Sequence, residues 1–149
     1  TPAAVGRGIT AMAANRNVTA AQQNLARALL SAIGEVVTVT DEGQIDAVTA
    51  LSGSGPAYVF LLTECLTEAG KKLGLPEDLA TRLARATVSG AGELMRVSGL
   101  PAETLRQNVT SPKGTTHAAL QILMAEGGMM KLFEDALAAA EKRSRELAS

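Results

Sequence analysis

One polar segment with the chemistry of an anion site precedes an apolar helical stretch, and it reads Ser111-Pro112-Lys113-Gly114-Thr115-Thr116. Backbone N–H groups at the start of a helix have no intrahelical partner, and the helix dipole there favours anions. Lys113 adds a positive charge, and Thr115 or Thr116 adds a hydroxyl. These groups together predict a site for a carboxylate or a phosphate. The residues leave one alternative open, an ordinary threonine cap of the helix that follows.

A second candidate segment combines serines and glycines ahead of another helix, and it reads Ser52-Gly53-Ser54-Gly55-Pro56-Ala57-Tyr58. Glycines let a backbone approach a ligand closely, and serine hydroxyls beside a helix start can donate or accept hydrogen bonds. A simple helix-capping turn explains the same residues. The segment is not a dinucleotide fingerprint, because Gly53 and Gly55 follow a short helix rather than a strand.

The other residues that could do chemistry are isolated. His117 is the only histidine, and without an acidic partner nearby in sequence we expect a surface residue. Cys65 is the only cysteine, so no internal disulfide forms, and a reducing, cytoplasmic setting is expected. Its apolar helical surroundings predict a buried structural thiol. No group of residues has the spacing of metal ligands, so no metal site is predicted.

Helices whose ends are marked by glycine and proline position both segments. We expect a short helix at 45–51 and longer helices at 57–73, 116–126 and 129–148. The sequence Gly-Leu-Pro, with at least one acidic residue in the next two positions, occurs at Gly74 and again at Gly99, and this pattern ends one helix and begins the next. Small residues spaced along the intervening helix predict close helix packing, with a pocket wall as the alternative.

The first 40 residues have a different character. A Gly-interrupted stretch at 5–12 is followed by a helix with Thr19 as N-cap and Gly34 as its stop, and then by a β-branched strand at 35–40. One strand–helix–strand unit cannot form a stable parallel sheet alone, because such sheets are covered on both faces. We therefore expect the end of a larger α/β domain, with a boundary at the polar residues 41–43.

The composition fits a globular chain of 149 residues, with 46% hydrophobic and 19% charged residues. Aromatic residues make up only 2%, so aliphatic side chains and alanine must form the core. The net charge of −1 and the scattered basic residues argue against nucleic-acid binding. No apolar run approaches the roughly 20 residues of a membrane-spanning helix, so no membrane partner is expected.

Three segments in register resemble the pyrroline-5-carboxylate reductase family. Residues 49–58 resemble the segment that begins the family's dimerisation domain, and residues 111–116 resemble its substrate loop, usually Ser-Pro-Gly-Gly-Thr-Thr. Residues 1–6 resemble the stretch after the loop near the nicotinamide. The resemblance covers the whole chain in order and spacing. It implies a mainly α fold, in which residues 1–43 are the carboxy-terminal remnant of a Rossmann domain and residues 44–149 form a helical dimerisation and substrate-binding domain.

The resemblance also implies an enzyme of proline biosynthesis, which reduces the C=N bond of 1-pyrroline-5-carboxylate to L-proline with NADPH or NADH. Carried over, the substrate-binding residues are Ser111, Lys113, Gly114, Thr115 and Thr116, with Thr116 in the catalytic role of holding the ring nitrogen. Thr1 and Pro2 would lie near the cofactor. A homodimer of interlocked helices is expected, and whether dimers assemble into larger rings stays open.

Two departures from the family pattern matter. Lys113 replaces the first glycine of the substrate loop, so a positive φ there would be strained, unless the loop adopts another shape or the ammonium assists anion binding. Most of the dinucleotide site is absent from these residues, so the chain alone is expected to be inactive. Two other interpretations remain: a noncatalytic helical oligomerisation module, and the helical domain of a different Rossmann-type dehydrogenase.

Overall fold

The computed structural model describes residues 1–148. Helices dominate, and the described residues form one two-stranded parallel sheet, so the predicted fold class is confirmed. The chain divides into two compact units. The first contains Thr1–Pro56 and the chain from Asp135 onward, and the second is Ala57–Glu134.

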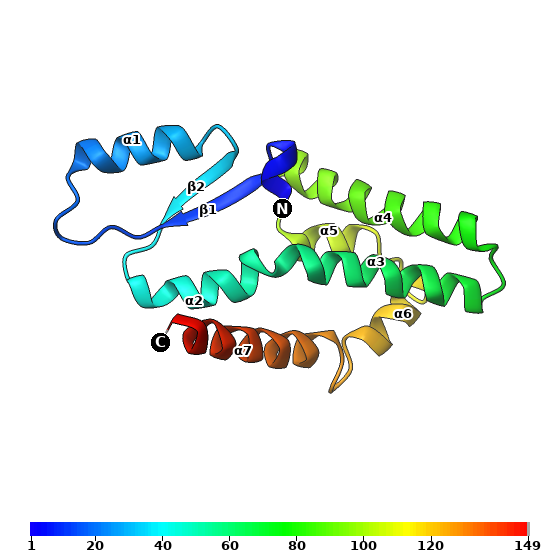
Figure 1. The fold of residues 1–149 in the computed structure, drawn as a ribbon. Coiled ribbons are helices and arrows are strands. Elements are labelled where there is room, and N and C mark those ends of the chain that lie inside the picture. Colours follow the sequence, from blue (N-terminus) through cyan, green and yellow to red (C-terminus); the bar gives the residue numbers. More distant parts are fainter. Residues whose placement is uncertain (149) are drawn as a thin grey trace. The chain divides into compact units, whose positions relative to one another are not determined.

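The α/β part of the first unit follows the predicted order (Figure 1). A 3-10 turn, Pro2–Val5, precedes strand β1 (Gly8–Met12), helix α1 (Ala20–Leu30) and strand β2 (Gly34–Thr38). The predicted N-cap of α1 is confirmed: the Thr19 side chain accepts from the Gln22 amide, and the Gln22 side chain accepts from the Thr19 amide. This reciprocal capping box satisfies two donors that a helix start leaves free.

The prediction that Gly34 ends helix α1 is wrong. The helix ends earlier, at Leu30, and Gly34 opens β2 opposite Gly8 of β1. Its φ of 152° and its closeness to the Gly8 backbone explain why glycine is needed. Arg27 of α1 ties the helix to β2 by donating to the carbonyl of Val36 (2.7 Å) and to Thr38 Oγ1 (2.5 Å).

The serine–glycine segment is helical rather than a loop, which corrects the sequence interpretation. After a 3-10 turn (Glu42–Gln44), helix α2 (Ile45–Val48) continues into a π-helical turn (Thr49–Gly53), and helix α3 (Gly55–Lys72) begins directly afterwards. The Ser54 amide donates to the Thr49 carbonyl at 2.9 Å, the wide spacing of a π turn. Pro56 has no N–H, so the α-helical hydrogen bond that would reach back from it is missing.

This continuity changes one expectation about membranes. The helical run Glu42–Lys72 spans 31 residues and reaches a mean hydropathy of 1.3, enough by length and composition alone to cross a membrane. The prediction that no segment approaches that length is therefore wrong, because the serine–glycine segment does not interrupt the helix. Apolar core helices of proteins outside membranes meet the same criterion.

The second unit is built on an antiparallel pair, α3 and α4 (Glu77–Ser98), which lie side by side in Figure 1. The position where a Cβ of Gly70 would lie is 3.3 Å from the Ala80 Cβ, so the two helices touch at small residues as predicted. Gly74 and Gly99 have φ of 96° and 63°, the left-handed conformation of helix ends. The prolines that follow them are N-caps rather than first helical residues.

Of the two short helices that remain in this unit, one was predicted at 116–126 and the other was expected after Pro101 without bounds. Helix α5 spans Ala102–Asn108 and helix α6 spans Thr115–Leu123. The Arg106 guanidinium lies 3.2 Å from the Met124 sulfur, which joins the two segments. The last helix, α7 (Met129–Ala148), begins in this unit, and its Phe133 ring packs edge-on against Tyr58 of α3 with 6.2 Å between centroids.

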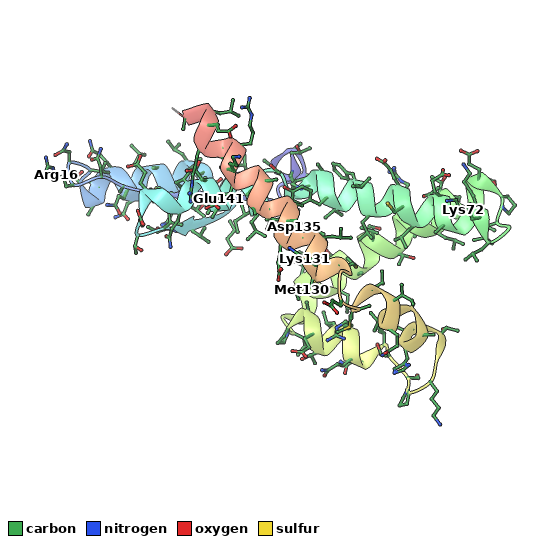
Figure 2. All side chains as sticks on the ribbon, turned by 90° about the horizontal axis from the view of Figure 1, so that it is seen from below. Arg16, Lys72, Met130, Lys131, Asp135 and Glu141 are labelled. Atoms are coloured by element: carbon green, nitrogen blue, oxygen red, sulfur yellow. The ribbon has the colours of Figure 1, made fainter. Side chains whose placement is uncertain are left out.

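The far part of α7 belongs to the first unit, where a polar contact joins it to α2. Ser144 Oγ donates to Asp46 Oδ1 at 2.6 Å, and the Arg145 guanidinium lies 3.9 Å from the same carboxylate. Glu141 completes the cluster by pairing with Arg145 at 2.7 Å. Figure 2 places Glu141 on α7 beyond Asp135, Lys131 and Met130.

Few side chains of the single chain are buried. Among the described hydrophobic residues, only Ala50, Ala80 and Ala84 are buried. The α3 residues Phe60 and Leu61 are each 57% exposed. Cys65 is exposed as well, so the prediction of a buried thiol is wrong for the chain alone, because residues 1–148 leave that side chain open to solvent. An apolar surface of this extent is typical of an interface rather than of a monomer.

Candidate functional site

A tight turn holds the predicted anion segment in front of α6. The Gly114 amide donates to the Ser111 carbonyl at 3.0 Å, with Pro112 and Lys113 at the two central positions. Lys113 has φ of 60° and is the one non-glycine residue with positive φ in the described part of the chain. Proline followed by positive φ is the pattern of a type II turn. The loop thus keeps a glycine-type backbone at a lysine, at a cost of about 1–2 kcal/mol.

The start of α6 offers backbone donors rather than a threonine cap. Gly114 is the N-cap, and no side chain caps the helix, so the alternative of an ordinary threonine cap is wrong. The Gly114 amide is engaged in the turn, which leaves the amides of Thr115, Thr116 and His117 as the first donors without intrahelical acceptors. These donors and the positive end of the helix dipole favour a bound anion.

The side chains around these donors differ in exposure. Thr116 is half-buried, while Lys113, Thr115 and His117 are exposed, and the exposure of His117 agrees with its predicted surface position. No hydrogen bond is found for the Thr116 hydroxyl within residues 1–148. A Cβ at Gly114 would lie 3.1 Å from the Ser111 carbonyl oxygen, so glycine suits this position best.

The structure thus brings five of the predicted site residues together in one turn and helix start: Ser111, Lys113, Gly114, Thr115 and Thr116. Thr1 and Pro2 belong to the other unit. There the Thr1 carbonyl accepts from the Ala4 amide at 3.1 Å, and Pro2 opens a short 3-10 turn. No cluster of histidine, cysteine or acidic residues suited to a metal occurs among the residues described.

Sequence reasoning missed a groove of about 1030 Å³ between α3 and α4. Its walls carry aliphatic, aromatic, hydroxyl and charged groups from both helices: Val59, Phe60, Thr63, Glu64, Thr67, Glu68, Thr81, Arg82, Arg85, Ala86, Val88 and Ser89. The Thr63 and Thr67 hydroxyls donate to carbonyls one turn earlier in α3, at 2.9 and 3.0 Å. Their polar groups are therefore satisfied inside the helix. A signal for this groove exists in the sequence: apolar residues such as Val59, Leu62 and Leu66 are spread widely around the helix 57–73.

The helical part of the chain matches a known family model. Residues 42–147 match the model described as pyrroline-5-carboxylate reductase dimerisation. The chain belongs to the pyrroline-5-carboxylate reductase family.

Family members resemble the chain over nearly all of its length. The pyrroline-5-carboxylate reductase of Pseudomonas aeruginosa is 49% identical over 99% of this chain, and that of Corynebacterium melassecola is 46% identical. A solved pyrroline-5-carboxylate reductase from Coxiella burnetii covers 99% of the chain with a TM-score of 0.92 and 44% identity. A Plasmodium falciparum pyrroline carboxylate reductase with NADP bound has a TM-score of 0.84 and 32% identity.

The match covers only part of each relative. The chain spans 54% of the Pseudomonas and Corynebacterium reductases, 54% of the solved Coxiella chain and 56% of the Plasmodium chain.

Proposed function

We propose that this chain is the substrate-binding and dimer-forming half of a pyrroline-5-carboxylate reductase, an enzyme of proline biosynthesis that reduces 1-pyrroline-5-carboxylate to L-proline. Family membership supports the reaction class. The observation that carries the substrate assignment is the start of α6, where free amides beside a lysine suit the carboxylate of the substrate.

In this proposal the chain binds and orients the substrate, and the cofactor supplies the reducing power. The amides of Thr115 and Thr116 hold the carboxylate, and the Thr116 hydroxyl hydrogen-bonds the ring nitrogen. Bound NADPH or NADH would supply the hydride for the carbon of the C=N bond, and the nitrogen would gain a proton from water or would already be protonated. Thr116 orients the imine rather than ionising, because an alcohol is too weak an acid to serve as the proton source.

The residues described contain no suitable binding site for the phosphates of a dinucleotide. The connection from β1 to α1, residues 13–19, contains no glycine, so it lacks the tight turn that lets a backbone approach a pyrophosphate. We propose that residues 1–43 are the end of a dinucleotide-binding domain and that residues 44–149 form the dimerisation and substrate domain. Thr1 and Pro2 would then border the nicotinamide, and the phosphate site would lie in other residues of the whole enzyme.

The activity is tested with the whole enzyme and with this chain alone. We expect the whole enzyme to oxidise NADPH or NADH when 1-pyrroline-5-carboxylate is added, and residues 1–149 alone to show no turnover. Proline formed in step with cofactor consumption identifies the product. A whole enzyme that ignores this substrate but reduces other imines or ketones would instead support a different Rossmann-type dehydrogenase. Lack of any reductase activity would favour the noncatalytic module.

We also propose a homodimer built on the helical domain, in a cytoplasmic setting and without a membrane partner. The exposed apolar residues of α3 and the sparse core of the single chain support a second copy as the missing cover. Light scattering at micromolar concentration should give twice the chain mass. A stable monomer, or a chain that partitions into lipid vesicles through Glu42–Lys72, would contradict this expectation.

A further inference from the structure

Lys113 occupies a backbone conformation that glycine would adopt more easily. Its φ of 60° lies in the left-handed region, where a Cβ crowds the following carbonyl oxygen. Glycine has no Cβ and enters this region freely. A side chain kept in such a conformation is expected to supply something that glycine lacks, and strained residues of this kind gather at ligand sites. What Lys113 supplies is a long side chain with a positive charge.

The charge of Lys113 is not paired with an acidic group in the part of the chain that the structure describes. The side chain is exposed, and no ion pair within residues 1–148 involves it. No acidic residue occurs in the sequence between Glu103 and Glu126, and Glu103 already lies 3.7 Å from the Arg106 guanidinium. The Lys113 ammonium therefore contributes an uncompensated positive charge to the turn in front of α6.

This charge stands at the same end of α6 as the free amides. The tight turn from Ser111 to Gly114 holds the Lys113 backbone just before the first of these amides, which belongs to Thr115. Charges in water act on each other over about 8 Å at physiological ionic strength, so the ammonium need not touch a bound anion to attract it. An anion held by the amides is therefore stabilised by Lys113, whereas a neutral group at the same place is not.

We propose that Lys113 is a selectivity residue of the substrate site, which favours cyclic imines that carry a carboxylate over cyclic imines that do not. This inference rests on the proposed function and adds to it how the site selects its substrate. The amides and the Thr116 hydroxyl bind and orient the groups that they touch, whereas Lys113 acts at longer range on the charge of the ligand. Removal of the Lys113 charge should therefore weaken the binding of the charged substrate alone.

The test compares two substrates of the whole enzyme, 1-pyrroline-5-carboxylate and 1-pyrroline, which is the same ring without the carboxylate. Lys113→Met keeps a long unbranched side chain and removes the charge. We expect the KM for 1-pyrroline-5-carboxylate to rise about twofold to fivefold with kcat nearly unchanged, which is the range that an exposed ion pair contributes. The preference for the carboxylate-bearing imine, measured as the ratio of the two kcat/KM values, should fall by the same factor.

Ionic strength provides a second readout, which does not depend on turnover of 1-pyrroline. Added salt screens exposed charges, so it should raise the KM of the unchanged enzyme for 1-pyrroline-5-carboxylate more than that of Lys113→Met. Lys113→Arg retains the charge and should keep both the KM and the salt response. Lys113→Gly removes the charge and the left-handed strain together and should behave as Lys113→Met does. Lys72→Met, at the exposed lysine that ends α3 and is labelled in Figure 2, is the matched control and should change neither quantity.

Three outcomes would overturn this role of Lys113. An unchanged KM of Lys113→Met, or an equal rise for both imines, would show that the charge does not act on the carboxylate. A KM that rises only in Lys113→Gly would show that the shape of the turn matters and its charge does not. A higher KM for NADPH or NADH instead of the imine would assign the charge to the phosphates of the cofactor. A whole enzyme that does not reduce 1-pyrroline-5-carboxylate is a separate result, which overturns the proposed function itself.

Discussion

Replacing Thr116 by alanine in the whole enzyme should lower turnover about a hundredfold while leaving stability nearly unchanged. Loss of one donor that strengthens towards the transition state costs on the order of 3 kcal/mol at comparable sites. The free energy of unfolding should change little, because Gly114 and not Thr116 occupies the N-cap of α6. Alanine is a better helix former than threonine by roughly 0.5 kcal/mol, so the melting temperature should hold or rise slightly. Turnover and thermal unfolding of the same preparation measure both quantities.

Two neighbouring substitutions provide the controls. Thr116→Ser keeps a hydroxyl at the same place and should retain most of the turnover. Thr115→Ala removes an exposed hydroxyl one residue earlier and should leave turnover close to normal. A Thr116→Ala enzyme with normal turnover and a lower melting temperature would remove Thr116 from the site and assign it a structural role only.

Replacing Gly34 by alanine should unfold the α/β part of the first unit. An added Cβ would lie 1.9 Å from the Gly8 carbonyl oxygen, far inside contact distance, and φ at Gly34 is 152°. The clash is with backbone of the paired strand, so β1 and β2 must separate or shift. We expect a loss of roughly 3 kcal/mol or more, at the upper end of single substitutions. Hydrogen exchange resolved by peptide should show faster exchange in β1 and β2 while α4 keeps its protection.

Gly43→Ala is the matched control in the same unit. A Cβ there would meet only the Asp41 side chain, at 3.3 Å, whose carboxylate accepts from the Gly43 amide, so at most this one capping hydrogen bond is disturbed. Its exchange pattern should remain that of the unchanged chain. Equal protection of β2 in the Gly34→Ala and Gly43→Ala chains would show that the sheet tolerates the added carbon.

Local sequence signals predicted most of the fold because the relevant interactions are themselves local. Thr19 with a glutamine three residues later specifies a capping box, and the Gly-Leu-Pro pattern specifies helix ends at Gly74 and Gly99. The π turn at Thr49–Gly53 escaped prediction. Serine, glycine and proline usually end helices. Here the hydrogen bond from the Ser54 amide to the Thr49 carbonyl shows that the helix continues through them as a wider π-helical turn.

The candidate site was likewise predictable in part from the sequence. The resemblance placed Ser111, Lys113, Gly114, Thr115 and Thr116 in one segment, and the structure shows that segment as one turn and helix start. The engagement of the Gly114 amide and the left-handed Lys113 depend on turn geometry, which residue types alone do not determine. The exposure of Cys65 also escaped prediction, because burial depends on what covers a helix face rather than on the sequence of that face.

The scarcity of enclosed side chains in the single chain has a consequence for how the molecule responds to dilution. Since Ala50, Ala80 and Ala84 are the buried hydrophobic residues among those described, folding and association of the proposed dimer become one equilibrium governed by mass action. The midpoint of thermal unfolding then rises with the logarithm of protein concentration. The amount of this protein that a cell synthesises would thereby set how much of it is folded.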